Sequence, residues 1–238
     1  MTYGTNNRHK ITILKDQVKA LLFRISRRKY TQREMLSQAS TIGEKHAICN
    51  NLLGVHQSRF EIINLLDLIN KRKINPEVIC EIGTANGGTN LFLASSIPSV
   101  KTVLGIDLYV KNKNKIRFFL TGKETHFFNG SSYSPNMINQ VKKQLNGRKI
   151  DILFIDGDHR YLGVKNDFEL YRPMVRKGGL ICFHDIVPDY LTRRNQFTGM
   201  WTGDVPKYWN EIKPSFSHDE ITESDDQDGQ GIGVIIND

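Results

Sequence analysis

The fold is decided by one stretch of the chain, Val78-Ile79-Cys80-Glu81-Ile82-Gly83-Thr84-Ala85-Asn86-Gly87-Gly88-Thr89. Residues 78–82 form a short apolar run, which is typical of a buried strand, and the run ends at Gly83. Glycines in the following turn let the backbone bend sharply and let a ligand approach closely. Residues 89–95 read as a helix, whose first turn has unpaired N–H groups. A strand, a glycine turn and a helix in this order predict a ligand site at the carboxyl end of a strand in an open α/β sheet.

Apolar runs alternate with helical segments through the rest of the chain. This alternation predicts a mostly parallel sheet that is covered by helices on both faces. A charged segment, residues 217–230, looks like a loop and precedes a last apolar run. The remaining expected strands are 102–106, 125–128, 151–155, 179–183 and 231–236, and the expected helices are 135–145, 168–175 and 207–213.

The first third of the chain reads differently. Helical spacing continues over about 31–51 and 58–71 and stops at Asn75-Pro76, with no strand pattern before it. We therefore expect an N-terminal helical extension, residues 1–75, followed by an α/β domain, residues 76–238.

The net charge of +8 is concentrated at the N-terminus, where residues 1–30 hold eight lysines and arginines and one acid. Apolar residues recur there at helical spacing from Ile11 to Ile25, which predicts a basic amphipathic helix. Such a helix usually packs on its own domain or on a second subunit, so we expect a homo-oligomer. The alternative is peripheral contact of residues 9–30 with an anionic membrane. Interleaved aromatic residues are missing, which argues against nucleic acid as a partner.

The composition excludes several other classes. No apolar run approaches the roughly 18 residues of a membrane span, and the first ten residues do not resemble a secretory signal. The three cysteines lack metal-site or paired spacing, and Cys80 and Cys182 sit within apolar runs. A cytoplasmic protein fits these observations best.

The glycine turn and the end of the second expected strand together suggest a nucleoside. The turn reads Gly-x-x-x-Gly-Gly, so it is neither a dinucleotide fingerprint nor a P-loop. Asp107 follows Gly83 by 24 residues and closes the next strand, where an acid can accept hydrogen bonds from ribose hydroxyls. These features predict an adenosine-type ligand. The alternative is a structural turn whose acid caps neighbouring backbone.

Acids and imidazoles follow two later strands, in Asp156-Gly157-Asp158-His159 and in His184-Asp185. The carboxyl ends of neighbouring parallel strands face one crevice, so these groups should converge. A divalent cation such as Mg²⁺ or Mn²⁺ would relieve their repulsion, and a histidine could take a proton at neutral pH. The alternative is a solvated acidic loop with strand-end caps.

The segments 81–90, 105–107, 151–161 and 177–186 together resemble those of class I S-adenosylmethionine-dependent methyltransferases. More narrowly, they are similar to the cephalosporin-hydroxylase-like and rhamnosyl or macrolide-sugar O-methyltransferases. The resemblance covers about residues 52–238. It implies a Rossmann-like sheet of seven strands, mostly parallel, whose last strand, residues 231–236, is antiparallel.

The resemblance also implies roles for individual residues. His159 matches the proposed base of the macrolide-sugar enzymes, and Asp158 holds the position suggested as base in other relatives. Asp156 and Asp185 match metal ligands, with His184 standing where several relatives carry an acid, so the metal's identity is open between Mg²⁺ and Mn²⁺. The residues expected to contact S-adenosylmethionine are Glu81, Gly83, Thr84, Gly87, Asp107, Ser131, Ser132 and Asp156.

The implied reaction is methyl transfer from S-adenosylmethionine to a hydroxyl of a sugar, a glycosylated small molecule or a glycan. Residues after the fifth expected strand could form a sugar-stacking wall or could be core: Phe197, Met200, Trp201, Tyr208 and Trp209. Three alternatives stay open from the residues alone. They are a metal-dependent hydrolase using Asp156, Asp158, His184 and Asp185, a nucleotide-linked oxidoreductase, and a non-catalytic module.

Overall fold

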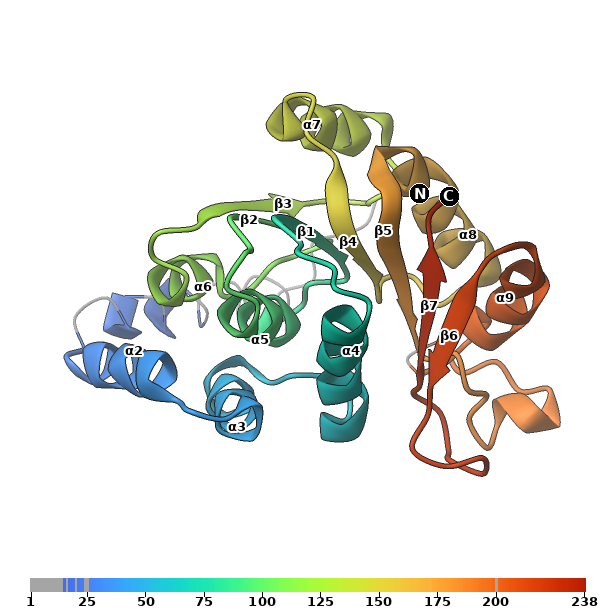
Figure 1. Ribbon diagram of the computed structural model, residues 1–238, viewed down its shortest axis with the longest axis horizontal. Coiled ribbons are helices and arrows are strands. Elements are labelled where there is room, and N and C mark those ends of the chain that lie inside the picture. The colour runs from blue at the N-terminus through green and yellow to red at the C-terminus, as the bar shows by residue number, and fades with distance from the viewer. Residues whose placement is uncertain (1–14, 16, 20, 24–25, 200) are drawn as a thin grey trace.

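A computed structural model describes residues 15, 17–19, 21–23, 26–199 and 201–238. In this part of the chain, seven strands form one sheet in the order β3-β2-β1-β4-β5-β7-β6, with β7 antiparallel to both of its neighbours (Figure 1). This confirms the expected Rossmann-like sheet. The strands are β1 (Val78–Ile82), β2 (Thr102–Asp107), β3 (Glu124–Asn129), β4 (Ile150–Ile155), β5 (Val175–His184), β6 (His218–Ile221) and β7 (Ile232–Ile236).

Helices cover both faces of the sheet (Figure 1). One apolar cluster joins α2 to α6 with one face, and a second cluster joins α7 to α9 with the other. The strands are buried on both faces, which is why they read as continuous apolar runs. The helices are α2 (Arg28–Gln38), α3 (Ile42–Leu53), α4 (Arg59–Lys71), α5 (Gly88–Ser96), α6 (Lys113–Phe119), α7 (Pro135–Leu145), α8 (Tyr161–Tyr171) and α9 (Val205–Ile212).

The sheet reverses its strand order at β1, and this reversal positions the site. β1 pairs in parallel with β2 on one side and with β4 on the other. Just past the strand ends, the Gly83 N–H donates to the Ile106 carbonyl, and the Asp156 N–H donates to the Ile82 carbonyl, both at 2.8 Å. The two crossovers leave β1 in opposite directions, so a crevice opens at the carboxyl ends of these strands.

Two helix boundaries differ from expectation for local reasons. The single helical segment expected at 31–51 is two helices, α2 and α3, because a capping box starts a new helix at Thr41. The Thr41 hydroxyl accepts from the Glu44 N–H, and the Glu44 carboxylate accepts from the Thr41 N–H, both at 3.1 Å. The helix expected at 168–175 instead runs from Tyr161 to Tyr171, and β5 already begins at Val175.

The expectation of a loop over 217–230 is wrong at its start, where β6 forms. β6 is the last strand of the sheet and pairs only with β7. Of its four residues only Ile221 is buried, and Asp219 forms an ion pair with Arg72 at 2.5 Å. Charged side chains are typical of an edge strand, which hides its β character from a hydropathy pattern.

Helix α6 was likewise absent from the expected elements.

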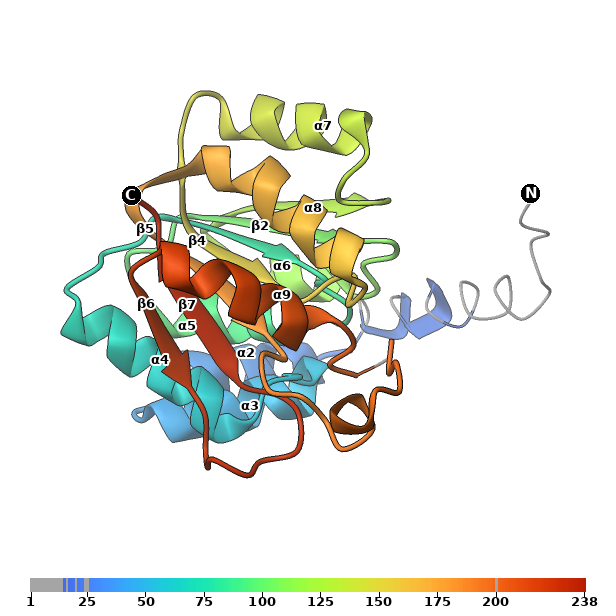
Figure 2. The ribbon, with the colours of Figure 1, turned by 90° about the vertical axis from the view of Figure 1, so that its right-hand side faces the viewer.

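The predicted N-terminal helix lies largely outside the described residues, which exclude 1–14, 16, 20 and 24–25. The described part projects from the body in Figure 2. There the Phe23 ring packs edge-on against Phe118 at 5.5 Å between centroids. Three apolar side chains of this part are about half exposed, namely Val18, Leu21 and Leu22. Membrane contact, self-association and the domain boundary at residue 76 stay predictions.

Within the described part of the chain, no helix combines the length and the apolar character that crossing a membrane requires.

Candidate active site

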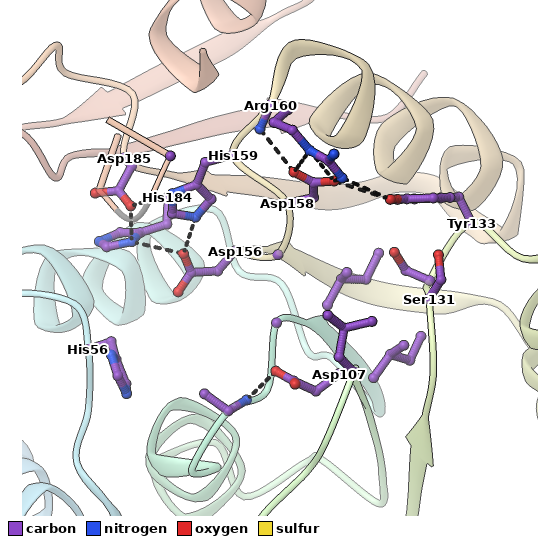
Figure 3. A pocket seen from close by; sticks show the side chains of 18 of the residues that line it. His56, Asp107, Ser131, Tyr133, Asp156, Asp158, His159, Arg160, His184 and Asp185 are labelled. Carbon is purple, nitrogen blue, oxygen red and sulfur yellow. Dashed lines mark hydrogen bonds and ion pairs between the residues drawn. The ribbon is translucent and has the colours of Figure 1, made fainter. Parts of the chain in front are cut away.

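A cavity of about 570 Å³ opens at the carboxyl ends of β1, β2, β4 and β5 (Figure 3). It has two ends, which we name by their residues. The nucleoside end is formed by Gly83, Asp107 and Ser131, and the acid–imidazole end by Asp156, His159, His184 and Asp185. The predicted site residues that line the cavity are Gly83, Asp107, Ser131, Ser132, Asp156, Asp158, His159, His184 and Asp185.

Three predicted cofactor residues, Glu81, Thr84 and Gly87, do not line this cavity. Glu81 is buried, with Oε2 unpartnered, and burial followed by repulsion from Asp156 raises the pKa of its carboxyl well above the ordinary value. The Thr84 hydroxyl donates to the Glu81 carbonyl at 3.3 Å. A Cβ at Gly87 would lie 2.2 Å from Ile116 Cδ1. These residues contribute to the packing and hydrogen bonding of the glycine turn. Their contact with a cofactor stays a prediction.

Gly83 is required by its surroundings. Its φ is +89°, and a Cβ there would lie 1.8 Å from the Asp156 carbonyl oxygen. A larger residue would be strained in this conformation and would push β1 away from the end of β4. The absence of a side chain at Gly83 therefore lets the ends of β1 and β4 lie close together, between the two ends of the cavity.

Asp107, at the end of β2, is fixed by backbone donors. Its Oδ2 accepts from the Ala85 N–H and its Oδ1 from the Tyr109 N–H, each at 2.8 Å. Each carboxylate oxygen has a second lone pair, so a ribose hydroxyl can still donate to it. The glycine turn and the acid are thus locked to one another in a fixed orientation.

The loop after β3 carries polar atoms into the same region. Ser131 Oγ is buried and has no hydrogen-bond partner among the described residues, although Ser131 lines the cavity, which suits a ligand atom there. The Ser132 hydroxyl instead donates to Asp167 at 2.5 Å. Burial raises the pKa of Asp167 to about 7, with repulsion from Asp158 adding to the effect and the Ser132 hydrogen bond opposing it.

The acid–imidazole end brings the predicted metal ligands together. One ligand atom from each of Asp156, His184 and Asp185 lies within 4.8 Å of the others. His184 Nδ1 lies 3.2 Å from Asp156 Oδ1 and 3.4 Å from Asp185 Oδ2. Two carboxylates and one imidazole that converge in a buried corner fit a divalent cation.

The charges of this corner are strongly coupled. Burial would lower the pKa of His184, but the carboxylates of Asp156 and Asp185 raise it well above the ordinary value. Burial would raise the pKa of Asp156, yet His184 and His159 hold it below its ordinary range. A bound cation would replace the imidazole protons as the counter-charge, so cation and proton compete for this corner.

Helix α4 and the loop before it support the acids from behind. Gln57 donates to Asp156 Oδ2 at 2.9 Å and accepts from the Thr89 hydroxyl at 2.6 Å. Glu61 places its Oε2 3.6 Å from His184 Nε2. Gln57 and Glu61 are buried, and neither was predicted as a site residue. Ser58 and Glu61 do match a capping box in sequence, but that pattern marks a helix start and no function.

The two candidate bases lie in different environments (Figure 3). His159 Nδ1 contacts the Trp201 carbonyl, and Nε2 lies 3.5 Å from Asp156 Oδ1. Asp158 is instead held by Arg160 at 2.5 Å and by the Tyr133 hydroxyl at 3.2 Å. The Arg160 guanidinium lowers the pKa of Asp158. A carboxylate whose pKa is lowered is a weaker proton acceptor, which favours His159 as the base.

Backbone strain gathers around the cavity. Three residues that line it have positive φ without being glycine, namely Ala85 at 44°, Asp185 at 63° and Gln230 at 59°. Such conformations cost of order 1–3 kcal/mol each and persist where the surroundings enforce them. Asp185 follows the end of β5, and its Oδ2 lies 3.4 Å from His184 Nδ1.

The aromatic residues after β5 divide into two groups. Tyr208 and Trp209 are core, at 2% and 1% exposure. Trp201 is 46% exposed and lines the cavity, whereas Phe197 is exposed without lining it. Met200 lies outside the described residues.

Lining residues that the sequence did not suggest include His56, Tyr133 and Arg160, which carry no spacing or motif signal.

Residues 51–227 match the family described as rhamnosyl O-methyltransferase/CmcI. The chain belongs to this family. The match spans the glycine turn, Asp107 and both acidic strand ends, so it confirms the family that those motifs resemble.

Solved O-methyltransferase structures have the same fold. One from Bacillus cereus, in complex with S-adenosylhomocysteine, is 16% identical, with a TM-score of 0.57 over 87% of this chain and 97% of that one. A putative O-methyltransferase from Klebsiella pneumoniae is 14% identical, with a TM-score of 0.58 over 92% and 100% of the two chains.

A relative by sequence is the uncharacterized protein R132 of Acanthamoeba polyphaga mimivirus, 40% identical over 112 residues. The match covers 44% of this chain and 49% of that protein, so the chain spans about half the length of this relative.

Proposed function

We propose that the protein transfers a methyl group from S-adenosylmethionine to a hydroxyl of a sugar, on a small glycoside or a glycan. One observation carries the proposal. A cavity joins a nucleoside end, with a glycine turn and a fixed acid, to an acid–imidazole end where the His159 ring lies between two carboxylates. Membership of the rhamnosyl O-methyltransferase/CmcI family supports the same reaction.

Bound S-adenosylmethionine supplies a sulfonium methyl group. Asp107 would accept the ribose hydroxyls while the Ala85 and Tyr109 amides keep its carboxylate in place. Ser131 Oγ, unpartnered in the wall, would bind a polar atom of the nucleoside. Alignment of donor and acceptor at about 3–3.5 Å supplies much of the rate in such a transfer.

His159 would take the hydroxyl proton as the methyl group is transferred. Its Nδ1 faces the Trp201 carbonyl, which fixes the tautomer with N–H at Nδ1 and leaves Nε2 to accept. Asp156 and Asp185 lie 3.5 and 3.7 Å from the ring and stabilise the imidazolium that forms. Burial would lower the pKa of His159, but Asp156 and Asp185 raise it above the ordinary value.

Asp156, His184 and Asp185 would hold a divalent cation. When bound, the cation supplies Lewis acidity that lowers the pKa of a hydroxyl on the acceptor. The residues of this chain orient the acceptor beside His159 in either case.

Trp201 supports a sugar as the acceptor. Its half-exposed ring at the wall of the cavity offers an apolar face beside polar groups, which suits the CH face and hydroxyls of a pyranose. Trp201→Ala should raise KM for a glycoside acceptor at least several-fold and leave the affinity for S-adenosylhomocysteine unchanged. Phe197→Ala is the matched control, because Phe197 is an exposed aromatic residue of the same loop that does not line the cavity.

The direct test is incubation with radiolabelled S-adenosylmethionine, a panel of deoxy-sugar glycosides, and Mg²⁺ or Mn²⁺. Label that appears on a glycoside hydroxyl, with S-adenosylhomocysteine as coproduct, supports the proposal. Release of phosphate from aryl phosphates with no methyl transfer would instead support the hydrolase alternative.

A further inference from the structure

Glu61 lies on the far side of His184 from the two candidate carboxylate ligands. It belongs to the first turn of α4 and is 1% exposed. Its Oε1 accepts from the Gly231 N–H at 2.7 Å, and its Oε2 accepts from the Ser58 N–H at 3.2 Å. The carboxylate is thus held by two backbone donors, one from the N-cap residue of α4 and one from the turn before β7, and the Gln227 side chain also donates to Oε1, at 3.4 Å.

The His184 ring bridges this pinned carboxylate and the acids. Nε2 is buried and lies 3.6 Å from Glu61 Oε2, and Nδ1 faces Asp156 and Asp185 at 3.2 and 3.4 Å. A neutral imidazole carries one N–H. Nδ1 is within hydrogen-bond distance of Asp156, whereas Nε2 only faces Glu61. If Nδ1 binds a cation, the one N–H must be at Nε2, where it faces the Glu61 carboxylate.

We propose that Glu61 is a positioning residue that fixes His184 as an Nδ1 ligand and thereby makes the site prefer Mn²⁺ to Mg²⁺. The inference rests on the proposed cation site. Histidine ligands in proteins commonly donate their other N–H to a carboxylate, which fixes the tautomer and raises the basicity of the ligand. An imidazole donor suits a borderline cation, whereas an all-oxygen set suits Mg²⁺.

Glu61→Gln tests this because an amide has one oxygen where the carboxylate has two. If the oxygen faces Gly231, the NH₂ group faces His184 Nε2, which must then accept and carry its proton at Nδ1, where it blocks the cation. If the oxygen faces His184 instead, the Gly231 N–H loses its acceptor and the contact with His184 loses the negative charge of the carboxylate. Both arrangements weaken the imidazole as a ligand.

The measurement is calorimetric titration of Mn²⁺ and Mg²⁺ into the full chain. Wild type should bind Mn²⁺ at least tenfold more tightly than Mg²⁺. Glu61→Gln should weaken Mn²⁺ by about 10–100-fold, the usual loss on removing such a partner. It should weaken Mg²⁺ less, so that the preference shrinks, and leave the affinity for S-adenosylhomocysteine within about twofold.

Two controls separate positioning from a structural effect. Glu44→Gln removes the same capping-box carboxylate from α3, far from the site, and should leave cation binding unchanged. In a His184→Asn background, a donor atom remains near the Nδ1 position, but the side chain of residue 184 no longer reaches Glu61. There Glu61→Gln should add no further loss, because residues that act through one contact are not additive.

Mn²⁺ affinity within twofold of wild type in Glu61→Gln would overturn the inference, and so would an equal loss in the His184→Asn background. Failure of the underlying proposal looks different. If the wild-type chain binds S-adenosylhomocysteine but neither cation, the proposed cation site is wrong. If it binds none of the three, the proposed function is wrong.

Discussion

The two ends of the cavity are built in different ways. The nucleoside end is shaped by backbone: a glycine turn at positive φ, an acid held by two amide donors, and strand ends that are tied together by carbonyl hydrogen bonds. The acid–imidazole end is shaped by side chains from the ends of β4 and β5, with Glu61 of α4 beside them. Burial disfavours the charged forms of these side chains, and the attraction between carboxylates and imidazoles favours them. The difference suggests that ligand position is set at the first end, and proton and cation chemistry at the second.

The largest effect is expected at the acid–imidazole end. His159→Ala should lower kcat of methyl transfer by about 10²–10⁴-fold, the usual contribution of a positioned base. The affinity for S-adenosylhomocysteine should change less than twofold in the same calorimetric assay. His126→Ala is the control, since His126 pairs with Glu124 on β3 away from the cavity. Unchanged turnover in His159→Ala would remove the base assignment.

The next largest effect is expected on stability, at Gly83, which lies between the two ends of the cavity. Gly83→Ala should destabilise the fold by about 3 kcal/mol or more, because the new methyl group overlaps the Asp156 carbonyl. Gly122→Ala is matched in backbone, at φ +92° against +89°, but has open space around it. It should cost only about 1–2 kcal/mol for the left-handed conformation. Equal urea midpoints for the two variants would contradict the packing argument.

Stability should fall with rising pH because of Asp167, beside the nucleoside end. Its pKa of about 7 in the folded chain lies above the ordinary value of 3.8. The stabilising contribution of the protonated form is therefore complete below about pH 4 and is lost as pH rises through 7. Between pH 5 and 8 the free energy of unfolding should drop by about 2–4 kcal/mol more in wild type than in Asp167→Asn. Parallel urea-denaturation profiles would contradict this.

A smaller effect is expected at the nucleoside end itself. Asp107→Ala should weaken S-adenosylhomocysteine by about 10–100-fold, the value of hydrogen bonds to a charged acceptor. Mn²⁺ affinity should stay within twofold of wild type, because Asp107 contacts none of the candidate cation ligands. Loss of both affinities would mean that the two ends of the cavity do not bind their ligands independently, which would contradict the division of roles between them.

Much of the fold was predictable because the strands are short apolar runs closed by glycine or acid. β1 matches its expected bounds at both ends, and the register of β1 with β2 and β4 brings Gly83, Asp107 and Asp156 to one edge of the sheet. β6 was missed because an edge strand needs few apolar residues and its acids pair with distant partners such as Arg72.

The site was predictable in part for the same reason. Residues that end a strand or directly follow one, such as His184 and Asp156, are placed by the sheet alone. Glu61 and Gln57 reach the site from a helix and a loop that precede the first strand, so only tertiary packing brings them there. Gly87 reads as a ligand-binding glycine in sequence, but its lack of a side chain is required by Ile116 of α6, a helix that the hydropathy pattern did not indicate.

Titration of the wild-type chain with S-adenosylhomocysteine, with and without Mn²⁺, shows directly whether the cavity binds a nucleoside. We expect one-to-one binding in both conditions, retained in His184→Asn and weakened in Asp107→Ala. No binding of S-adenosylhomocysteine by the folded wild-type chain in either condition would contradict it.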